Sequence, residues 1–410
     1  MGSKGFPAVD EPVPLADVAG RGWMLRDLPT PVMVLRGSAL EHNLALMAEY
    51  CHAWGVDIAP HGKTTMAPQL WRRQLDAGAW GITAATVDQV RVMRSAGVAR
   101  VLLANELVDP VSIAWVAAQL ADPGFELIGY VDSDRAVEIL DEGLRDAGAE
   151  RPLPVLVELG TEGGRTGCRS IPEAVHVASR VATAERLRLA GVSGYEGMIC
   201  RERSPACVAS VVAYLDRLRE LTVTMLDAGT FAGDERVILS AGGSSFFDLV
   251  VDRLRGPWPG SADVRVVLRS GCYLTHDSGF YERLSPLPSR DGPRGFAPAI
   301  ELWAHVLSRP EPELAILGFG KRDVSFDIDL PMPRVVRTAS GAVADIAGGL
   351  EIEALNDQHA YGRLRPGVSL DVGDLVGLDI SHPCTALDKW RTIPVLDDRD
   401  HVVDAIATSF

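Results

Sequence analysis

The sequence predicts an α/β protein with a TIM-like (β/α)8 barrel and a C-terminal β-barrel-like domain. Short apolar runs rich in β-branched residues alternate with longer helical patterns along the first two thirds of the chain. Repeated β-then-α units are typical of a parallel sheet covered by helices, and about eight units over roughly 250 residues is the size of a closed barrel. An open doubly wound sheet has a similar pattern. The barrel is preferred because no G-x-G-x-x-G motif follows either of the first two predicted strands.

Nine segments are predicted strands because apolar and β-branched residues concentrate in them. They are Pro31–Leu35, Val56–Pro60, Gly81–Ala85, Arg100–Ala104, Glu126–Val131, Pro154–Leu159, Arg188–Ser193, Val237–Ser240 and Val264–Arg269. Helical length and apolar spacing characterise the stretches between them. These are Ser38–Trp54, Ala67–Ala77, Val87–Ala96, Val111–Leu120, Asp134–Ala147, Pro172–Val181 and Cys207–Leu226.

The pattern changes near Pro286. Ser285–Pro298 contains four prolines and two glycines, which is typical of a linker or loop. Short alternating runs without a helical period follow it: Ala299–Leu307, Leu314–Gly318, Arg334–Thr338, Ala342–Ala347, Leu375–Ile380 and Arg391–Leu396. We therefore predict an all-β C-terminal domain of roughly 120 residues.

Composition excludes several classes of protein. The chain has 410 residues, of which 47% are hydrophobic, so a mainly disordered chain is excluded. A net charge of −15 argues against nucleic acid and anionic membrane as partners. Six scattered cysteines without a C-x-x-C pair favour a reducing cytosol over a disulfide scaffold. The first twenty residues do not resemble a signal peptide, and no apolar stretch is long enough to span a membrane, so we expect a cytoplasmic protein.

The sharpest local feature is the segment from Ala59 to Met66, which reads APHGKTTM. It lies where a predicted strand ends and a helix begins, at the face where barrel enzymes build their active sites. Lys63 there is a candidate for a Schiff base, if burial lowers its pKa. The alternative is an ordinary solvated loop lysine with His61 and Gly62 beside it.

Two glycine turns follow late predicted strands: SAGGSS at 240–245 and RSGCY at 269–273. Exposed backbone N–H groups and a helix N-terminus suit a phosphate, and in barrels the loops after strands seven and eight often bind one together. Tight turns need glycine in any case. A lysine near strand two combined with a late-strand phosphate site indicates pyridoxal phosphate.

Two further motifs are candidates for binding. His382 and Cys384 are two residues apart, which on a strand places both side chains on one face, within reach of one soft cation such as zinc. The alternative is a buried cysteine beside a structural histidine. Arg165 in a glycine loop would meet a cofactor or a substrate carboxylate, or it is a surface arginine. Asp323, Asp327 and Asp329 also resemble a metal cluster, but their turn-rich setting favours a structural role.

Together these motifs resemble one family. Thr30-Pro31, PHGKT at 60–64, GRTG at 164–167, Gly242-Gly243-Ser244, SGCY at 270–273 and HPC at 382–384 occur in this order in the D-serine dehydratase and D-threonine aldolase family. That family is part of the alanine racemase-like fold type of pyridoxal phosphate enzymes. The resemblance extends from about Asp27 to Leu396.

The resemblance implies roles for these residues. Lys63 would be the Schiff-base lysine, and Arg165 and Tyr195 would lie by the pyridine ring. The phosphate site would comprise Gly242, Gly243, Ser244, Gly271, Cys272 and Tyr273. His382 and Cys384 would bind a divalent metal, with zinc preferred and manganese the alternative. The segment from Asn356 to His359 resembles one that approaches the cofactor.

The resemblance also implies where the domains begin and end and that the chain forms a dimer. The barrel would comprise residues 27–284, and residues 1–26 would join 285–410 in the β-rich domain that carries the metal pair. A head-to-tail homodimer is expected.

Family members often have a histidine at the position of Thr65 in this chain. The acid–base role of that histidine would then fall to His61, His359 or a metal-bound water. Histidine with cysteine resembles the dehydratase arrangement, whereas aldolases more often have aspartate in place of Cys384. We therefore predict a metal-assisted lyase of D-3-hydroxy amino acids. Dehydration to a 2-oxo acid and ammonia is preferred. Retro-aldol cleavage to glycine and an aldehyde is the alternative, followed by racemisation and a non-catalytic cofactor carrier.

Overall fold

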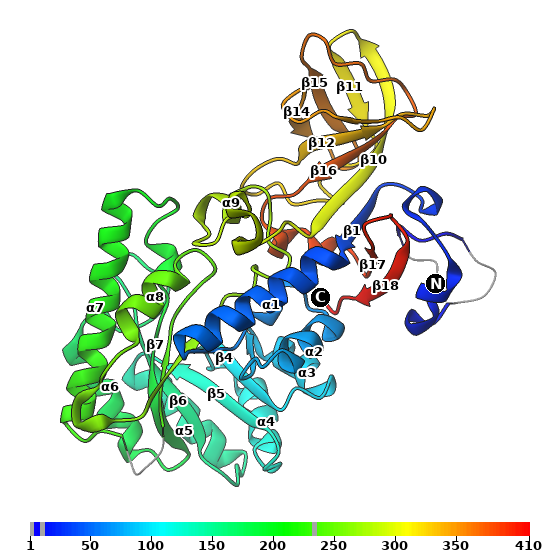
Figure 1. Ribbon diagram of the computed structural model, residues 1–410. Helices are drawn as coiled ribbons and strands as arrows, with labels where there is room; N and C mark the ends of the chain where they lie inside the picture. Colours follow the sequence, from blue (N-terminus) through cyan, green and yellow to red (C-terminus); the bar gives the residue numbers. More distant parts are fainter. Residues whose placement is uncertain (1–3, 9–12, 232–235) are drawn as a thin grey trace. The chain divides into compact units, whose positions relative to one another are not determined.

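The computed structural model describes residues 4–8, 13–231 and 236–410 (Figure 1). Its residue contacts divide the chain into two compact units, each built from separate segments. The β unit comprises Met1–Met47, Thr64–Arg73 and Cys272–Phe410. The barrel unit comprises Ala48–Lys63 and Gln74–Gly271.

The barrel unit contains an eight-stranded sheet in which all neighbouring strands are parallel. The strands are β2 Asp57–Ile58, β3 Ile82–Ala84, β4 Arg100–Glu106, β5 Glu126–Val131, β6 Leu153–Leu159, β7 Leu187–Gly194, β8 Val237–Ser240 and β9 Val264–Leu268. They are ordered β2-β9-β8-β7-β6-β5-β4-β3. This order follows the chain around a circle, as in a TIM-like barrel.

Hydrogen bonds between the first and last strands of this order close the barrel. The Trp80 N–H donates to the Ile58 carbonyl at 2.8 Å, and the Thr83 N–H donates to the Pro60 carbonyl at 2.9 Å. The Thr83 hydroxyl adds a bond to the Ala59 carbonyl at 2.6 Å. The interior is filled by side chains from most of the strands and from the end of β2: Ala59, Leu102, Ile128, Tyr130, Leu156, Ala190, Ile238 and Val267. The barrel centre is therefore a packed core and not a channel.

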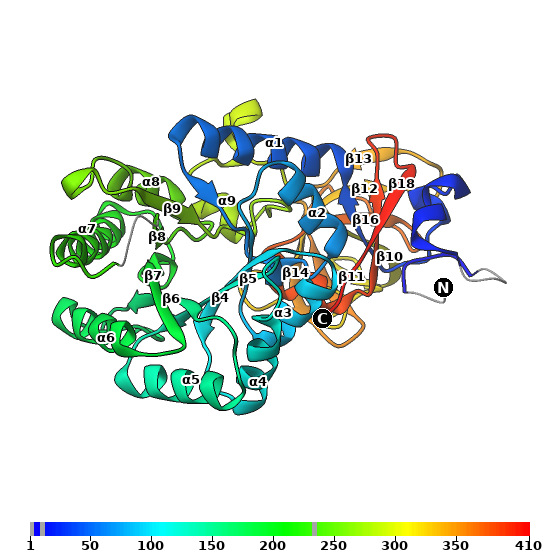
Figure 2. The same ribbon diagram turned by 90° about the horizontal axis from the view of Figure 1, so that it is seen from below.

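Helices lie around the outside of these strands (Figure 2). They are α3 Val87–Ser95, α4 Pro110–Gln119, α5 Asp134–Asp146, α6 Ile171–Thr183, α7 Pro205–Asp227 and α8 Phe247–Leu254. Five of them begin at a side-chain cap that accepts a backbone N–H of the first turn: Thr86, Asp109, Ser133, Ser170 and Ser204. Such caps satisfy N–H groups that have no partner within the helix, so the sequence determines where these helices start.

The β unit contains a ten-stranded sheet. Its strands are β1 Val32–Arg36, β10 Ile300–Glu311, β11 Leu314–Leu317, β12 Met332–Arg337, β13 Val343–Asp345, β14 Leu350–Leu355, β15 Ala360–Leu364, β16 Leu375–Asp379, β17 Thr392–Leu396 and β18 Val402–Ala407. Its main path is β13-β12-β16-β10-β1-β17-β18, and β11, β15 and β14 extend from β10. All pairs are antiparallel except β1 with β17. Residues 285–410 are all described and contain no α-helix, so the predicted all-β character is confirmed.

Three further α-helices lie in the described residues, together with short 3-10 turns. α1 Gly37–Trp54 and α2 Pro68–Asp76 each have residues in both units, and α9 Phe280–Leu284 lies in the β unit. Among the described residues, no helix has the length and apolar character needed to cross a membrane.

Some features differ from the sequence prediction. Pro31–Leu35 is a strand as predicted, but β1 pairs with β10 and β17 and does not belong to the parallel sheet. The eight strands predicted after it form the barrel. β14, β15 and β18 were not predicted. The alternation of buried and exposed residues is irregular in β14 and β18, whereas β15 keeps it. The contact-based units also have other boundaries than the predicted domains, since residues 27–47 lie in the β unit.

The cysteines also differ from expectation in one respect. Cys200 and Cys207 form a disulfide at the start of α7, with their Cα atoms 5.7 Å apart. Cys51, Cys168, Cys272 and Cys384 are not in a disulfide. The scattered cysteines therefore contain one pair that the sequence did not predict, because a loop brings together residues seven positions apart.

A buried ion network holds the centre of the β unit. The Glu301 carboxylate on β10 accepts bonds from the Arg36 guanidinium at 2.7 Å, from Arg334 at 2.7 Å and from the Trp303 indole N–H at 2.9 Å. Arg36 also pairs with Asp400 at 2.7 Å. One carboxylate therefore links β1, β10 and β12.

We expect Glu301→Gln to lower the midpoint of urea unfolding. Arg36 keeps Asp400 and Arg334 keeps Asp379 as partners, so the cost should be below the roughly 3–5 kcal/mol of breaking an isolated buried pair. Glu311→Gln, an exposed carboxylate on the same strand, is the matched control and should shift the midpoint little. Equal midpoints for the two variants would contradict the central role of Glu301.

Candidate functional site

Several candidate residues lie at one end of the barrel, because each follows the carboxyl end of a parallel strand. His61 and Lys63 follow β2, Tyr195 follows β7, and Gly271 follows β9. Arg165 lies in the loop after β6, and Gly242, Gly243 and Ser244 lie in the turn after β8. In barrel proteins this end carries the active site.

Lys63 lies in a short 3-10 turn, Gly62–Thr64, directly after β2. Among the described residues of its unit, no hydrogen bond or ion pair engages its ammonium group. His61 is half-buried, and its Nδ1 is buried without a hydrogen-bond partner. Burial and the positive charges of Lys63 and Arg269 lower the pKa of His61 well below its usual value, so the ring is neutral. A neutral imidazole and the Lys63 side chain therefore lie two residues apart at the barrel end.

The glycine turn after β8 is shaped by a residue that the sequence prediction did not include. Glu196 is fully buried, and its two carboxylate oxygens accept the Gly242 N–H at 3.1 Å and the Gly243 N–H at 2.6 Å. A Cβ on Gly242, where φ is +99°, would lie 2.6 Å from the Leu268 side chain, and one on Gly243 would lie 2.8 Å from the Tyr195 ring. Only glycine fits either position without displacing a neighbour.

Arg269 at the end of β9 is the second residue that the sequence prediction missed. Its buried guanidinium donates to the Ser240 hydroxyl at 2.8 Å and to the Gly194 carbonyl at 2.7 Å. Burial alone would lower its pKa, but neighbouring negative groups, including Glu196 and Glu158, raise it. Arg269 is therefore a fixed cation that ties β7, β8 and β9 together at the barrel end.

Arg165 and Tyr195 lie together, with the guanidinium 4.9 Å from the centre of the ring, a cation–π distance. Both line a small hollow with Glu158, whose Oε2 is buried and has no hydrogen-bond partner. The Tyr195 backbone is fixed by Tyr214, whose hydroxyl accepts the Tyr195 N–H at 2.9 Å and donates to the Leu159 carbonyl at 2.6 Å. The two predicted ring-binding residues therefore share a polar hollow on rigid elements.

These features fit pyridoxal phosphate. Lys63 has a side chain that could bind the cofactor aldehyde, the glycine turn has no side chains that would block a phosphate, and the hollow contains one unsatisfied carboxylate oxygen, Glu158 Oε2. The Gly242 and Gly243 amides already donate to Glu196, so direct phosphate contacts from them remain predictions, as do those of Ser244 and Gly271.

The β unit contains the predicted metal pair. The His382 Nδ1 lies 2.6 Å from Asp327 Oδ2, and the Cys384 Sγ lies 3.4 Å from the Thr64 hydroxyl. The Cys272 Sγ is also 3.4 Å from the Cys384 Sγ. Among the described residues, no group of three or more His, Cys, Asp or Glu side chains is arranged to hold a metal ion. The site therefore offers a nitrogen and a sulfur ligand, and further positions would remain for water or substrate.

The ionisation of this pair suits a soft cation. The hydrogen bond from Cys272 is the largest influence on Cys384, and together with His382 and Thr64 it lowers the pKa of the Cys384 thiol well below its usual value. Burial raises the pKa of Cys272, which therefore remains a thiol that donates. Burial opposes the charge on His382, but Cys384 and Asp327 raise its pKa to about 9. A thiolate and a histidine are ligands that zinc favours, and zinc binding would displace a proton from the imidazolium.

The remaining predicted residues are in the β unit. Tyr273 is buried, with its ring 5.8 Å from that of Phe296. His359 is exposed in the turn between β14 and β15, where its carbonyl accepts the Asn356 N–H at 2.8 Å. The described contacts give the His359 ring no partner, so its catalytic role and the role of Tyr273 remain predictions.

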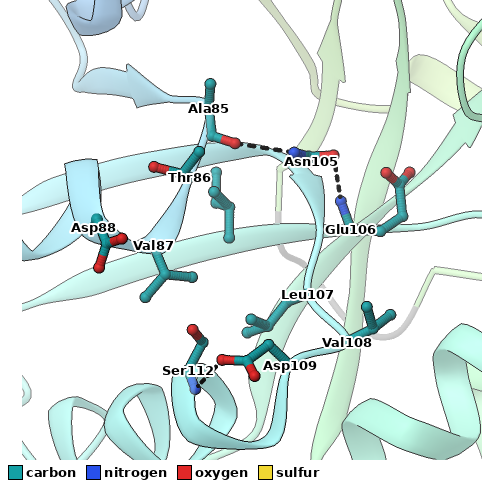
Figure 3. Close-up of a pocket in the computed structure, with 11 residues that line it drawn as sticks. Ala85, Thr86, Val87, Asp88, Asn105, Glu106, Leu107, Val108, Asp109 and Ser112 are labelled. Carbon is teal, nitrogen blue, oxygen red and sulfur yellow. Dashed lines mark hydrogen bonds between the residues drawn. The ribbon is translucent and has the colours of Figure 1, made fainter.

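A separate pocket of about 230 Å³ lies at the carboxyl ends of β3 and β4 in the barrel unit (Figure 3). Asn105 bridges its wall, because its Nδ2 donates to the Ala85 carbonyl at 3.0 Å and its Oδ1 accepts the Glu106 N–H at 3.1 Å. Burial and the charges of Glu158 and Asp132 raise the pKa of Glu106 to about 8. No motif in the sequence predicted this pocket, which contains none of the candidate residues.

Two relatives with named activities align with more than half of this chain. A D-threonine aldolase from Arthrobacter sp. is 26% identical over 96% of this chain and 95% of its own length. A D-threo-3-hydroxyaspartate dehydratase from Delftia sp. strain HT23 is 28% identical over 62% of this chain and 63% of its own length. These names agree with the family that the sequence resembles.

Solved structures have the same fold. The D-threonine aldolase of Filomicrobium marinum matches with a TM-score of 0.78 and 25% identity, covering 94% of this chain and 96% of the aldolase. An alanine racemase from Bacillus anthracis matches with a TM-score of 0.61 and 16% identity, covering 92% of this chain and 97% of the racemase. The predicted fold class, a TIM-like barrel with a β domain, is thereby confirmed.

Two family models match consecutive parts of the chain. Residues 299–396 match the "Putative serine dehydratase domain". Residues 35–252 match "Alanine racemase, N-terminal domain", which is more than half of the 410 residues. The chain therefore belongs to the alanine racemase N-terminal domain family.

Proposed function

We propose that this protein is a lyase that uses pyridoxal phosphate and a divalent metal to act on D-3-hydroxy amino acids, with dehydration to a 2-oxo acid and ammonia as its reaction. The named relatives are aldolases and dehydratases, so this chain is an enzyme of the lyase class. The observation that carries the proposal is that His382 and Cys384 lie in one turn, with Nδ1 of the histidine held by Asp327. A racemase would need no metal.

Each candidate residue has a task in this reaction. Lys63 would hold the cofactor and, when released, would accept the Cα proton of the substrate. Arg165 and Tyr195 would flank the cofactor ring, and Arg269 would keep the barrel end positively charged. When bound, the cofactor supplies an electron sink for the bond that breaks at Cα. His382 and Cys384 would hold the metal, whose Lewis acidity makes hydroxide a better leaving group.

Zinc is the proposed metal, and manganese is the alternative, because sulfur and imidazole ligands suit zinc. His61 and His359 are the proposed second acid–base groups. We further propose a cytoplasmic homodimer.

Retro-aldol cleavage to glycine and an aldehyde is the second candidate, because the relative that covers 96% of the chain is an aldolase. A metal on the β-hydroxyl serves both routes. The position of the base decides which bond breaks.

Product analysis with D-threonine and added zinc or manganese separates the two routes. We expect 2-oxobutanoate and ammonia, since cysteine at position 384 resembles the dehydratase arrangement. Glycine and acetaldehyde would replace the first candidate by the second. Absence of both sets of products from the cofactor-loaded protein, across a panel of D-3-hydroxy amino acids, would contradict the lyase proposal.

Replacing Lys63 tests its two proposed roles, attachment of the cofactor and removal of the Cα proton. Lys63→Ala should lower kcat by about 10²- to 10⁴-fold, the usual contribution of an acid–base group, and should remove the visible absorbance of lysine-bound cofactor. Lys321→Ala, which changes an exposed lysine, is the control and should keep both properties. Normal turnover by Lys63→Ala would contradict the assignment. A cofactor carrier would lose only the absorbance, because it has no turnover to lose.

Replacing His382 separates the metal from the cofactor. His382→Ala should abolish metal-dependent turnover while the cofactor absorbance stays, because the histidine is proposed to bind only the metal. His176→Ala, which changes an exposed histidine, serves as the control. Metal-stimulated activity at the wild-type level in His382→Ala would show that the metal binds elsewhere.

A further inference from the structure

We propose that Asp327 is a positioning residue that orients the His382 ring for metal binding; the inference rests on the proposed function. Asp327 belongs to the group of three aspartates, with Asp323 and Asp329, that resembles a metal cluster in the sequence. The structure gives each of the three a different set of partners.

Both carboxylate oxygens of Asp327 have partners in the turn that carries His382. The Oδ2 atom lies 2.6 Å from the His382 Nδ1, and the Oδ1 atom accepts the Thr385 hydroxyl at 2.7 Å. A carboxylate only accepts, so Nδ1 is the donor. Thr385 therefore holds Asp327 in the position from which it contacts the ring.

This contact selects one form of the imidazole. When Nδ1 carries the proton, the lone pair of Nε2 is left for a metal ion. Without a partner at Nδ1, the ring would sample several orientations and both tautomers. A carboxylate at the second nitrogen is the usual support of a metal-bound histidine.

The backbone of His382 is held separately. Its φ is +61°, in the left-handed region that few residues other than glycine adopt. The His382 N–H donates to Asp277 Oδ2 at 3.0 Å, while Asp277 Oδ1 accepts the Gly279 and Tyr281 N–H groups at 2.9 Å. Asp277 thus fixes the main chain of His382, and Asp327 fixes its ring.

The other two aspartates are engaged elsewhere. Asp323 accepts the Gly320 N–H at 2.8 Å and pairs with Lys4 at 2.5 Å. Asp329 accepts the Ser381 hydroxyl at 2.8 Å and pairs with Arg283 at 2.8 Å. Within the described part of the chain, Asp327 is therefore the member of this group that contacts the His382 ring.

The test measures metal affinity directly. The full-length, cofactor-loaded protein is titrated with Zn²⁺ in competition with a chromophoric chelator. We expect Asp327→Ala to weaken zinc binding by about 10- to 100-fold, with a smaller loss for Asp327→Asn. Asp388→Asn, an exposed carboxylate in the same segment, is the control and should bind zinc within about twofold of the wild type.

Two further readouts separate positioning from folding. The visible spectrum of the Co²⁺-loaded protein should change in Asp327→Ala, because the ligand geometry is altered. The cofactor absorbance and the Tm of the metal-free protein should stay close to those of the wild type. A large fall in both would indicate a structural role and overturn the proposal.

The outcomes also distinguish this inference from the proposed function. If His382→Ala loses zinc binding but Asp327→Ala binds zinc like the wild type, the positioning role is wrong and the metal site stands. If zinc binding is the same in wild type, His382→Ala and Cys384→Ala, or absent from all three, the metal site itself is wrong and the positioning role falls with it.

Discussion

A buried positive charge at the end of β9 organises the barrel end. Arg269 is enclosed by the strands that it joins, and a charge in such a place is tolerated only when hydrogen bonds and negative groups compensate it. Glu196 is among those groups, and the same carboxylate holds two amides of the glycine turn. The position of the turn, the neutrality of His61 and the charge of Arg269 are therefore connected.

In the β unit, buried carboxylates likewise accept hydrogen bonds from several groups in the interior. Glu301 gathers donors from three strands, and Asp277 gathers backbone N–H groups from a loop and from the turn that carries His382. Each carboxylate satisfies several donors that would otherwise be unpaired in the interior. The geometry of the candidate metal ligands thus depends on main-chain contacts that are distant in the sequence.

The sequence predicted the barrel because each strand and helix has its own local signal of apolar spacing and capping. It also singled out Lys63, His382 and Cys384 as candidates, since short motifs surround them, and their roles stay predictions. It did not single out Glu196, Arg269 or the contact of Asp327 with His382, because the significance of one charged residue depends on which distant groups enclose it. β1 was predicted as a strand, but its partners β10 and β17 are more than 250 residues away, and no local pattern indicates such pairing.

Each unit contains segments from distant parts of the chain, so a single cut cannot separate the protein into its two units. β1 comes from the first 40 residues, yet it occupies a central place in the sheet of the last 110, between β10 and β17. The barrel unit likewise needs residues 48–63 and 74–271 together. A cut at any position between β1 and β10 would put β1 on a different piece of chain from its partners. Exchange of the C-terminal half between related proteins would therefore also require exchange of the N-terminal strand, so the two ends of the chain must evolve together.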